Sequence, residues 1–108
     1  MLVAMPDALE AIAEPRRRRI LDTLREGESS VGALVESLGT SQPLVSKHLR
    51  VLREAGLVDV RVDGQRRLYR VRPEPLAELD AWLEPYRRMW QTSLDRLEAH
   101  LTEGEPDA

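Results

Sequence analysis

The chain has 108 residues, a net charge of −3 and no cysteine. This length suits a single domain with one modest core, and the lack of Phe means that the core must be mainly aliphatic. Without cysteine there can be no disulfide, thiolate metal site or thiol redox sensor. No apolar run approaches the ~18 residues of a membrane-spanning helix, and the N-terminus lacks a signal-peptide pattern, so we expect a cytoplasmic protein.

The charge is distributed unevenly along the chain. Residues 41–72 contain eight basic and three acidic side chains, a balance of +5, whereas the remaining residues contain eight basic and sixteen acidic ones, a balance of −8. Because the local field decides where a polyanion docks, this segregation favours a nucleic-acid-binding face on an acidic body.

Two short helices are predicted near the N-terminus. The first begins at Pro6 and ends before Pro15, which itself begins the second. Arg16–Arg19 surround the first turn of the second helix, so they cannot form one flat binding patch. Ion pairs with neighbouring acids, or one or two phosphate contacts, are the two interpretations of this run.

A pair of helices separated by a tight turn follows. Ser30 caps a helix that Gly39 ends, and Thr40 or Ser41 caps the next helix, which continues to Gly56. The second helix has an apolar stripe, and its other face carries amide, hydroxyl and cationic groups. Such groups suit base edges and phosphates, although an ordinary solvated helix face has the same composition. The residues of this polar face are Gln42, Ser46, Lys47, Arg50 and Arg53.

A β-hairpin is predicted directly after this helix. Leu57–Val62 alternates in polarity, Asp63-Gly64 is a two-residue turn signal, and Gln65–Val71 returns as the partner strand. This turn would pair Val62 with Gln65. It would also place Val58, Val60, Tyr69 and Val71 on one face, Arg61, Arg66 and Arg70 on the other, and Arg66 and Arg67 beside the tip. The linker Glu28–Ser30 could add a strand to the hairpin edge.

The segment Ser41–Val58, S-Q-P-L-V-S-K-H-L-R-V-L-R-E-A-G-L-V, resembles the recognition-helix signature of the ArsR/SmtB family of bacterial repressors. The likeness covers residues 8–71. It implies a mainly α fold, a winged helix-turn-helix with a small β-hairpin wing. It also implies a homodimeric, sequence-specific transcriptional repressor that binds double-stranded DNA at an inverted-repeat operator. The residues expected to meet DNA are Ser41, Gln42, Leu44, Ser46, Lys47, His48, Arg50, Arg61, Arg66, Arg67 and Arg17.

Three of these assignments stay open. The family pattern has an arginine matching Arg17, which contacts DNA or stabilises the fold. Leu44 could contact a thymine methyl group or pack against the preceding helix. His48 stands where the family often has histidine, and DNA contact or local hydrogen bonding is expected there rather than metal ligation.

The resemblance does not extend to the metal sites of the family. Residues 28–32, which match an E-L-C-V-C-type motif, have Ser30 and Gly32 at the two thiolate positions. The positions of the second family site are Pro73, Pro75, Tyr86 and Met89, none of which binds zinc. His100 and Glu103 keep an H-x-x-E spacing without a matching first half. We therefore expect no metal, no cofactor and no response to metals or thiol oxidants.

In the C-terminal region, residues 75–102, large apolar side chains recur three or four residues apart and so lie along one helix face, which we call the apolar seam. This spacing continues without a break across Pro85. This pattern predicts one long kinked helix or two nearly collinear helices, which dimerise with the first helix alongside. Residues 6–72 would form the DNA-binding core of the single domain 1–108, and residues 103–108 a disordered tail. The expected dimer-interface residues are Met5, Leu9, Leu79, Trp82, Leu83, Tyr86, Trp90, Leu94 and Leu97.

Two further interpretations remain beside the main one. Trp82, Tyr86 and Trp90 could line a pocket for a small apolar effector, although packing is the commoner use of such a stripe. The whole module could instead dock an acidic protein partner through its basic face, but Gln42 and Ser46 favour DNA because charge docking would not need them. No nucleophile elbow or phosphate loop is present, so an enzyme is not expected.

Overall fold

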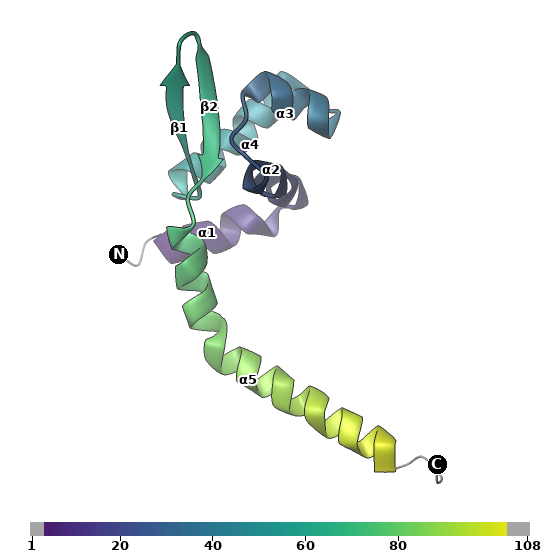
Figure 1. Ribbon diagram of the computed structural model, residues 1–108. Helices are drawn as coiled ribbons and strands as arrows, with labels where there is room; N and C mark the ends of the chain where they lie inside the picture. Colours follow the sequence, from purple (N-terminus) through teal and green to yellow (C-terminus); the bar gives the residue numbers. More distant parts are fainter. Residues whose placement is uncertain (1–3, 104–108) are drawn as a thin grey trace.

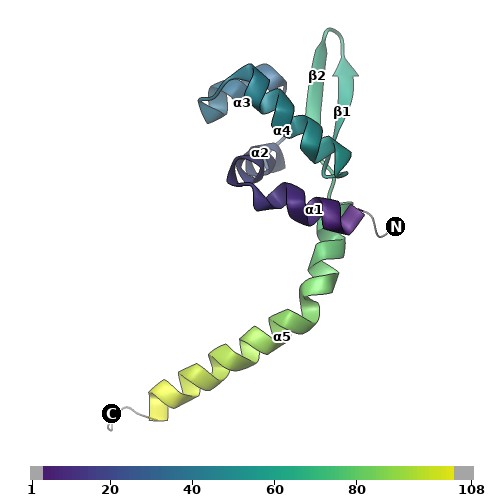
Figure 2. The ribbon, with the colours of Figure 1, turned by 180° about the vertical axis from the view of Figure 1, so that it is seen from behind.

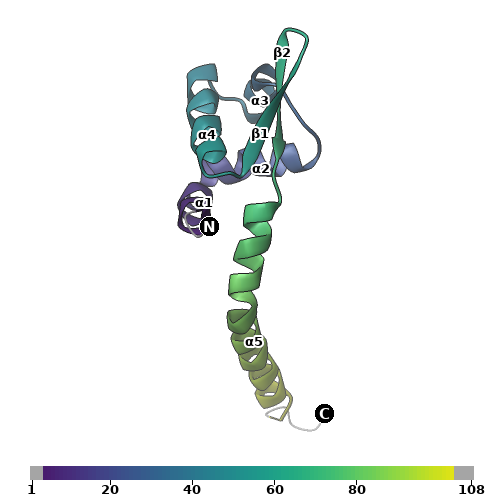
Figure 3. The ribbon, with the colours of Figure 1, turned by 90° about the vertical axis from the view of Figure 1, so that its left-hand side faces the viewer.

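The computed structural model describes residues 4–103, with the side chains of residues 7–102. It is mainly helical, with one antiparallel two-stranded hairpin, as predicted (Figure 1). The elements are α1 (Ala4–Ala13), α2 (Pro15–Arg25), α3 (Val31–Leu38), α4 (Gln42–Glu54), β1 (Val58–Asp63), β2 (Arg66–Val71) and α5 (Glu74–Glu103). Helices α1 to α4 and the hairpin form a core, from which α5 extends away (Figures 1 and 3).

The ends of α3 and α4 are set by short polar residues and glycines. The hydroxyl of Ser30 accepts a hydrogen bond from the N–H of Ala33 at 3.2 Å, and the hydroxyl of Ser41 accepts one from Leu44 at 3.4 Å. Gly39 ends α3 in the left-handed conformation, at φ 63°. Of the two capping candidates for α4, the structure therefore uses Ser41.

Helix α4 ends in a Schellman motif. Gly56 has φ 79° and donates its N–H to the carbonyl of Arg53, while Leu57 donates to the carbonyl of Leu52. A residue with a Cβ would be strained at Gly56. The motif turns the chain directly from α4 into β1, so it fixes the position of the hairpin relative to the helix.

The core is aliphatic, as the composition requires. Leu34, Leu49 and Leu52 are fully buried between the helices, and Leu57 and Val58 join them from the start of the hairpin. Tyr69 is half-buried against this cluster. Leu79 in the first turns of α5 is only 6% exposed, so it completes the core of its own chain and is not free for the dimer interface to which we had assigned it.

The hairpin turn lies one residue later than predicted. Asp63 pairs with Arg66, Val62 with Arg67 and Val60 with Tyr69, so Gly64-Gln65 forms the turn and the predicted pair Val62–Gln65 is wrong. Moving a two-residue turn by one position changes each partner by two residues, and two residues return to the same face of a strand. The predicted division of side chains between the two faces therefore survives.

The linker before α3 pairs with the hairpin edge at one isolated bridge and does not form the strand that the sequence allowed. Ser29 donates its N–H to the carbonyl of Tyr69 at 3.0 Å and accepts the N–H of Tyr69 at 2.8 Å. This bridge ties β2 to the segment between α2 and α3.

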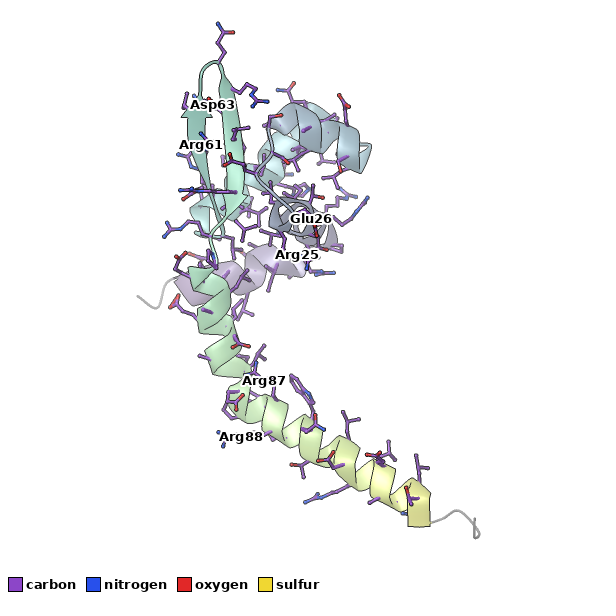
Figure 4. All side chains as sticks on the ribbon, viewed as in Figure 1. Arg25, Glu26, Arg61, Asp63, Arg87 and Arg88 are labelled. Atoms are coloured by element: carbon purple, nitrogen blue, oxygen red, sulfur yellow. The ribbon has the colours of Figure 1, made fainter. Side chains whose placement is uncertain are left out.

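Helix α5 is continuous through Pro85, which settles the choice left open by the sequence. The helix bends in its first half, close to the labelled Arg87 and Arg88 (Figures 1 and 4). Proline cannot donate a helical hydrogen bond, so a bend here has a physical cause. Arg87 bonds both Asp80 and Glu84 across this region. Within residues 4–103, no helix is long and apolar enough to cross a membrane.

Candidate DNA-binding surface

The face of α4 that carries amide, hydroxyl and cationic groups is exposed. Gln42, Ser46, Lys47 and Arg50 are all exposed, and Pro43 joins the last three in lining a shallow groove. Figure 2 shows α4 following the short turn after α3 and running toward the base of the hairpin. Among the described residues, neither Lys47 nor Arg50 has an ion-pair partner. These two cations are therefore free to meet an external anion.

The arginines on one face of the hairpin are, by contrast, paired within the chain. Arg61 contacts Glu28 at 2.5 Å, and Arg70 contacts Asp59 at 2.8 Å. Near the tip, Arg66 lies 3.6 Å from Asp63, and Figure 4 labels Arg61 and Asp63 on this hairpin.

These pairs shift the acidities of their carboxylates. The hydrogen bonds from Arg61 hold the pKa of Glu28 below its usual value, and the single hydrogen bond from Arg70 lowers the pKa of Asp59. Both acids therefore keep their charge to a lower pH than free carboxyl groups would.

Arg67 differs from the other hairpin arginines. It lies opposite Val62 on the other face of the hairpin, is exposed, and has no ion-pair partner within residues 7–102. Of the hairpin arginines, Arg67 is thus the one whose charge is directly available to a phosphate. The sequence pattern did not indicate the partners Glu28, Asp59 and Asp63. For the two aspartates, a correct hairpin register would have revealed them, since they lie directly opposite Arg70 and Arg66.

Of the residues assigned to DNA contact, His48 is buried, whereas both predicted roles of Leu44 stay open. The side chain of His48 is only 6% exposed, and within the described part of the chain neither ring nitrogen has a hydrogen-bond partner. Leu44 is half-buried and lines a cavity beside His48. The sequence carried a signal for His48, because it lies three residues after buried Val45 and four before buried Leu52, on the inward side of the helix.

Arg17 serves the fold. Its Nε donates to the carbonyl of Ala11 at 2.7 Å, and Arg18 donates to the carbonyl of Ile12 at 2.7 Å. The last carbonyls of a helix have no partner within it, so these two side chains complete the end of α1. Arg17 is therefore engaged in stabilising the α1–α2 corner, the second of its two predicted roles. Ion pairs with neighbouring acids were one interpretation of this arginine run. Arg17 and Arg18 are instead held by backbone carbonyls of α1.

The seam expected at the dimer interface is largely uncovered. Trp82, Tyr86 and Trp90 are 46%, 45% and 48% exposed, and Leu94 and Leu97 are both 54% exposed. Leu9 on α1 is 42% exposed, and Leu83 is half-buried. The ring centroids of Trp82 and Tyr86 are 4.9 Å apart.

Two further predictions lie outside the described part of the chain. They concern the side chain of Met5 and residues 104–108 of the predicted tail, while Glu103 belongs to α5.

Comparisons with known proteins agree with this geometry. The sequence model described as "Bacterial regulatory protein, arsR family" matches residues 14–60. The HTH-type transcriptional regulator Rv2034 of Mycobacterium tuberculosis is 41% identical over 94% of this chain and 92% of its own length. The biofilm growth-associated repressor of Agrobacterium fabrum is 42% identical over 66% of this chain, and the match spans 61% of that repressor.

A solved structure shows the same arrangement. The homodimeric winged helix-turn-helix DNA-binding domain of Mb0332 from Mycobacterium bovis, described as a possible ArsR-family regulator, is 33% identical to this chain. The match has a TM-score of 0.66 and covers 81% of each chain. The exposed polar face of α4, the hairpin beside it and these similarities lead to one conclusion: the chain belongs to the arsR family of bacterial regulators and is a winged helix-turn-helix, DNA-binding transcriptional regulator, not an enzyme.

Proposed function

We propose that the protein is a homodimeric repressor that reads an inverted-repeat operator with α4 and responds to neither metals nor thiol oxidants. The observation that carries this proposal is the exposed face of α4, where Gln42 and Ser46 lie next to the unpaired cations Lys47 and Arg50. A helix with this face fits the major groove, where amides read base edges and cations bind phosphates.

Gln42 is the residue we assign to base reading. It occupies the first turn of α4 and is exposed, and a glutamine amide can pair with both N6 and N7 of adenine for ~1–3 kcal/mol of discrimination. Ser46 lies one turn further along the same face. Two copies related by a twofold axis would read half-sites about 10 base pairs apart, or a multiple of that spacing.

Selection of bound duplexes from a random pool tests this role. The wild-type protein should enrich an inverted repeat, and Gln42→Ala should lose preference at one position per half-site with little change in affinity for random DNA. Gln91→Ala on α5, where Gln91 bonds Asp95, is the matched control and should select the wild-type site. If Gln42→Ala weakens random DNA as much as the selected site, Gln42 positions the helix and does not read a base.

The α5 seam is the surface we assign to dimerisation. Its large apolar side chains are about half exposed, and a contiguous exposed apolar stripe marks an interaction surface. The homodimeric Mb0332 domain, which shares this fold, supports a second copy of the chain as the occupant.

Sedimentation equilibrium tests this assignment against the subunit mass of 12.3 kDa. Trp90→Glu should shift the equilibrium toward the monomer, because it places a charge on the seam. Thr92→Glu adds the same charge about 200° around the helix and should leave the equilibrium unchanged. Equal effects of the two variants would remove the seam from the interface.

The proposed lack of metal response rests on the residues at the family's ligand positions. Ser30 is occupied as the cap of α3, and proline side chains at 73 and 75 have no donor atom. Within the described residues, no three potential ligands lie together. Zinc at micromolar concentration should therefore leave the DNA affinity unchanged, and stoichiometric tight binding of zinc would contradict the proposal.

A further inference from the structure

A cavity of about 350 Å³ lies between the first turns of α2, the turn after α3 and the inward flank of α4. Its volume falls in the range of small-ligand sites. None of its lining residues belongs to the exposed groove of Pro43, Ser46, Lys47 and Arg50. The cavity is therefore distinct from that groove, although it adjoins the first turn of α4 through Leu44. Its lining residues are Arg16, Arg19, Ile20, Leu38, Gly39, Thr40, Leu44, Val45 and His48.

The floor of the cavity combines apolar side chains with one polar group. Ile20 and Val45 are each 1% exposed, and His48 is 6% exposed. Burial lowers the pKa of His48, so its ring is neutral at pH 7 and offers one N–H donor and one acceptor nitrogen. Neither nitrogen has a partner among the side chains and backbone that the structure describes. A buried polar group without a partner costs free energy. A ligand that forms a hydrogen bond with this ring would remove that cost, which would favour its binding.

The rim of the cavity is cationic. Arg16 and Arg19 lie one turn apart on α2 and are exposed, and neither has an ion-pair partner among the described residues. Their neighbours Arg17 and Arg18 are held by the carbonyls of α1. The carboxylate of Glu14 accepts the backbone N–H of Arg16 at 2.6 Å, so that acid is engaged as the cap of α2. Two free guanidinium groups at the mouth of an apolar cavity suit a carboxylate.

The cavity also contacts the elements that place α4. Leu38, Gly39 and Thr40 form the turn between α3 and α4, and Leu44 lies in the first turn of α4 itself. A ligand held between α2 and this turn would bind more tightly to some placements of α4 than to others. Such a difference in affinity is what couples one site, the cavity, to another, the DNA-binding face of α4.

From this arrangement we propose that the cavity binds a small organic acid. The carboxylate meets Arg16 and Arg19, a compact apolar body fills the space over Ile20 and Val45, and a polar group at its far end bonds His48. The acid acts as an effector, because it occupies the joint between α2 and the DNA-binding helix. The effector role rests on the proposed function of α4, whereas the binding site does not.

The test uses 4-hydroxybenzoate, which carries a carboxylate and a hydroxyl at opposite ends of an apolar ring. Hexanoate and phenyl phosphate serve as further probes. The chain has two histidines, so the imidazole NMR signals of His48 can be followed against those of His100, which is exposed on α5. Millimolar 4-hydroxybenzoate should shift the His48 signals saturably and leave those of His100 in place. The uncharged analogue 4-hydroxybenzamide should bind at least about tenfold more weakly, because it lacks the charge-assisted bonds.

Variants distinguish the site from nonspecific binding. Arg16→Gln with Arg19→Gln should weaken 4-hydroxybenzoate by at least about tenfold, and both side chains are exposed, so the fold should persist. Arg25→Gln, at the other end of α2, removes an exposed arginine that pairs only with Glu26 and should bind as the wild type does. If none of the three acids shifts His48 at millimolar concentration, or if both histidines shift alike, the binding site is refuted.

DNA measurements complete the test. Saturating 4-hydroxybenzoate should change the affinity of the protein for a selected duplex, and the Arg16→Gln and Arg19→Gln variant should abolish that change. Binding of the acid without any change in DNA affinity would overturn the effector role. If the double variant weakens random DNA while no acid shifts His48, the rim binds DNA phosphate and the proposal is wrong.

Discussion

Helix α4 and the hairpin both carry exposed cationic side chains, but these differ in whether a carboxylate lies beside them. Lys47 and Arg50 on α4 have no ion-pair partner in the described part of the chain, whereas Arg61, Arg66 and Arg70 each contact a carboxylate within it. A count of basic residues treats the two regions as equal. Among the residues that the structure describes, three of the four hairpin arginines lie beside a carboxylate, and Arg67 does not. We therefore expect DNA to find the charges of α4 and Arg67 available and to compete with carboxylates for the other three.

The competition is a mild one. The hairpin pairs are exposed, and exposed ion pairs contribute only ~0–1 kcal/mol each. Phosphates can therefore displace Asp59 or Asp63 at modest cost, so the hairpin adjusts the affinity that α4 establishes. The expected effects of substitutions follow that order.

The largest effect should come from removing the unpaired cations of α4. Lys47→Ala with Arg50→Ala should weaken binding to all duplexes by about a hundredfold for each bound subunit, if each lost phosphate bond accounts for about tenfold. It should also reduce the log–log salt slope by ~1.8 for each bound subunit, since each neutralised phosphate contributes ~0.9. Fluorescence anisotropy over a series of salt concentrations measures both.

The control for this prediction changes the same charge elsewhere. Arg25→Ala with Arg96→Ala removes two cations from α2 and α5, outside α4 and the hairpin. Its slope should equal that of the wild type. If the two double variants behave alike, net charge and not the local surface governs binding.

A smaller effect on the salt slope is expected in the hairpin, and it should differ between Arg66 and Arg67, the two arginines beside the tip. Arg67→Ala should reduce the salt slope by ~0.9 for each bound subunit, because Arg67 has no partner within residues 7–102. Arg66→Ala should reduce it by less, because Asp63 already compensates part of that charge. A larger loss for Arg66 than for Arg67 would invalidate the distinction between paired and unpaired hairpin arginines.

Releasing a paired arginine should strengthen binding slightly. Asp63→Asn removes the carboxylate beside Arg66 and, with it, a negative charge that repels the DNA phosphates. DNA affinity should therefore rise about two- to fivefold at low salt. Asp22→Asn, at an exposed position of α2, makes the same change away from the hairpin and serves as the reference. No difference between these variants would show that the Asp63 pair does not restrain Arg66.

The smallest effect should appear in stability against pH. The pKa of Asp59 is lowered in the folded state by its bond from Arg70, so the pair stabilises the fold above the unfolded pKa of about 3.9. That contribution is lost as the pH falls from there through the lowered pKa. Asp59→Asn should therefore lose less stability than the wild type over this range in urea denaturation. Parallel curves for the two proteins would contradict the assigned pair.

Local signals in the sequence predict most of the fold. Ser30, Ser41, Gly39 and Gly56 define the limits of α3 and α4 because capping depends on a few neighbouring residues. The hairpin faces are also predictable, although the turn is displaced by one residue. Asp63-Gly64 fits a two-residue turn by composition, but the structure uses Asp63 as the last paired residue of β1.

The site was less predictable because it depends on contacts between elements. The bonds of Arg17 and Arg18 to α1 require the angle between α1 and α2, which no local pattern encodes. The pairing of Arg61 with Glu28 joins residues 33 positions apart. His48 is the exception, since its spacing from Val45 and Leu52 indicated burial, while its polarity and position on a basic helix favoured DNA contact.

The positions of the two tryptophans give the protein a built-in optical reporter. Trp82 and Trp90 are its only tryptophans, both lie on the seam of α5, and each is about half exposed. Their emission should therefore move to shorter wavelength when a second chain covers the seam and return on dilution. Helix α4 and the hairpin contain no tryptophan, so subunit exchange can be followed by native fluorescence while DNA binding is followed separately with a labelled duplex.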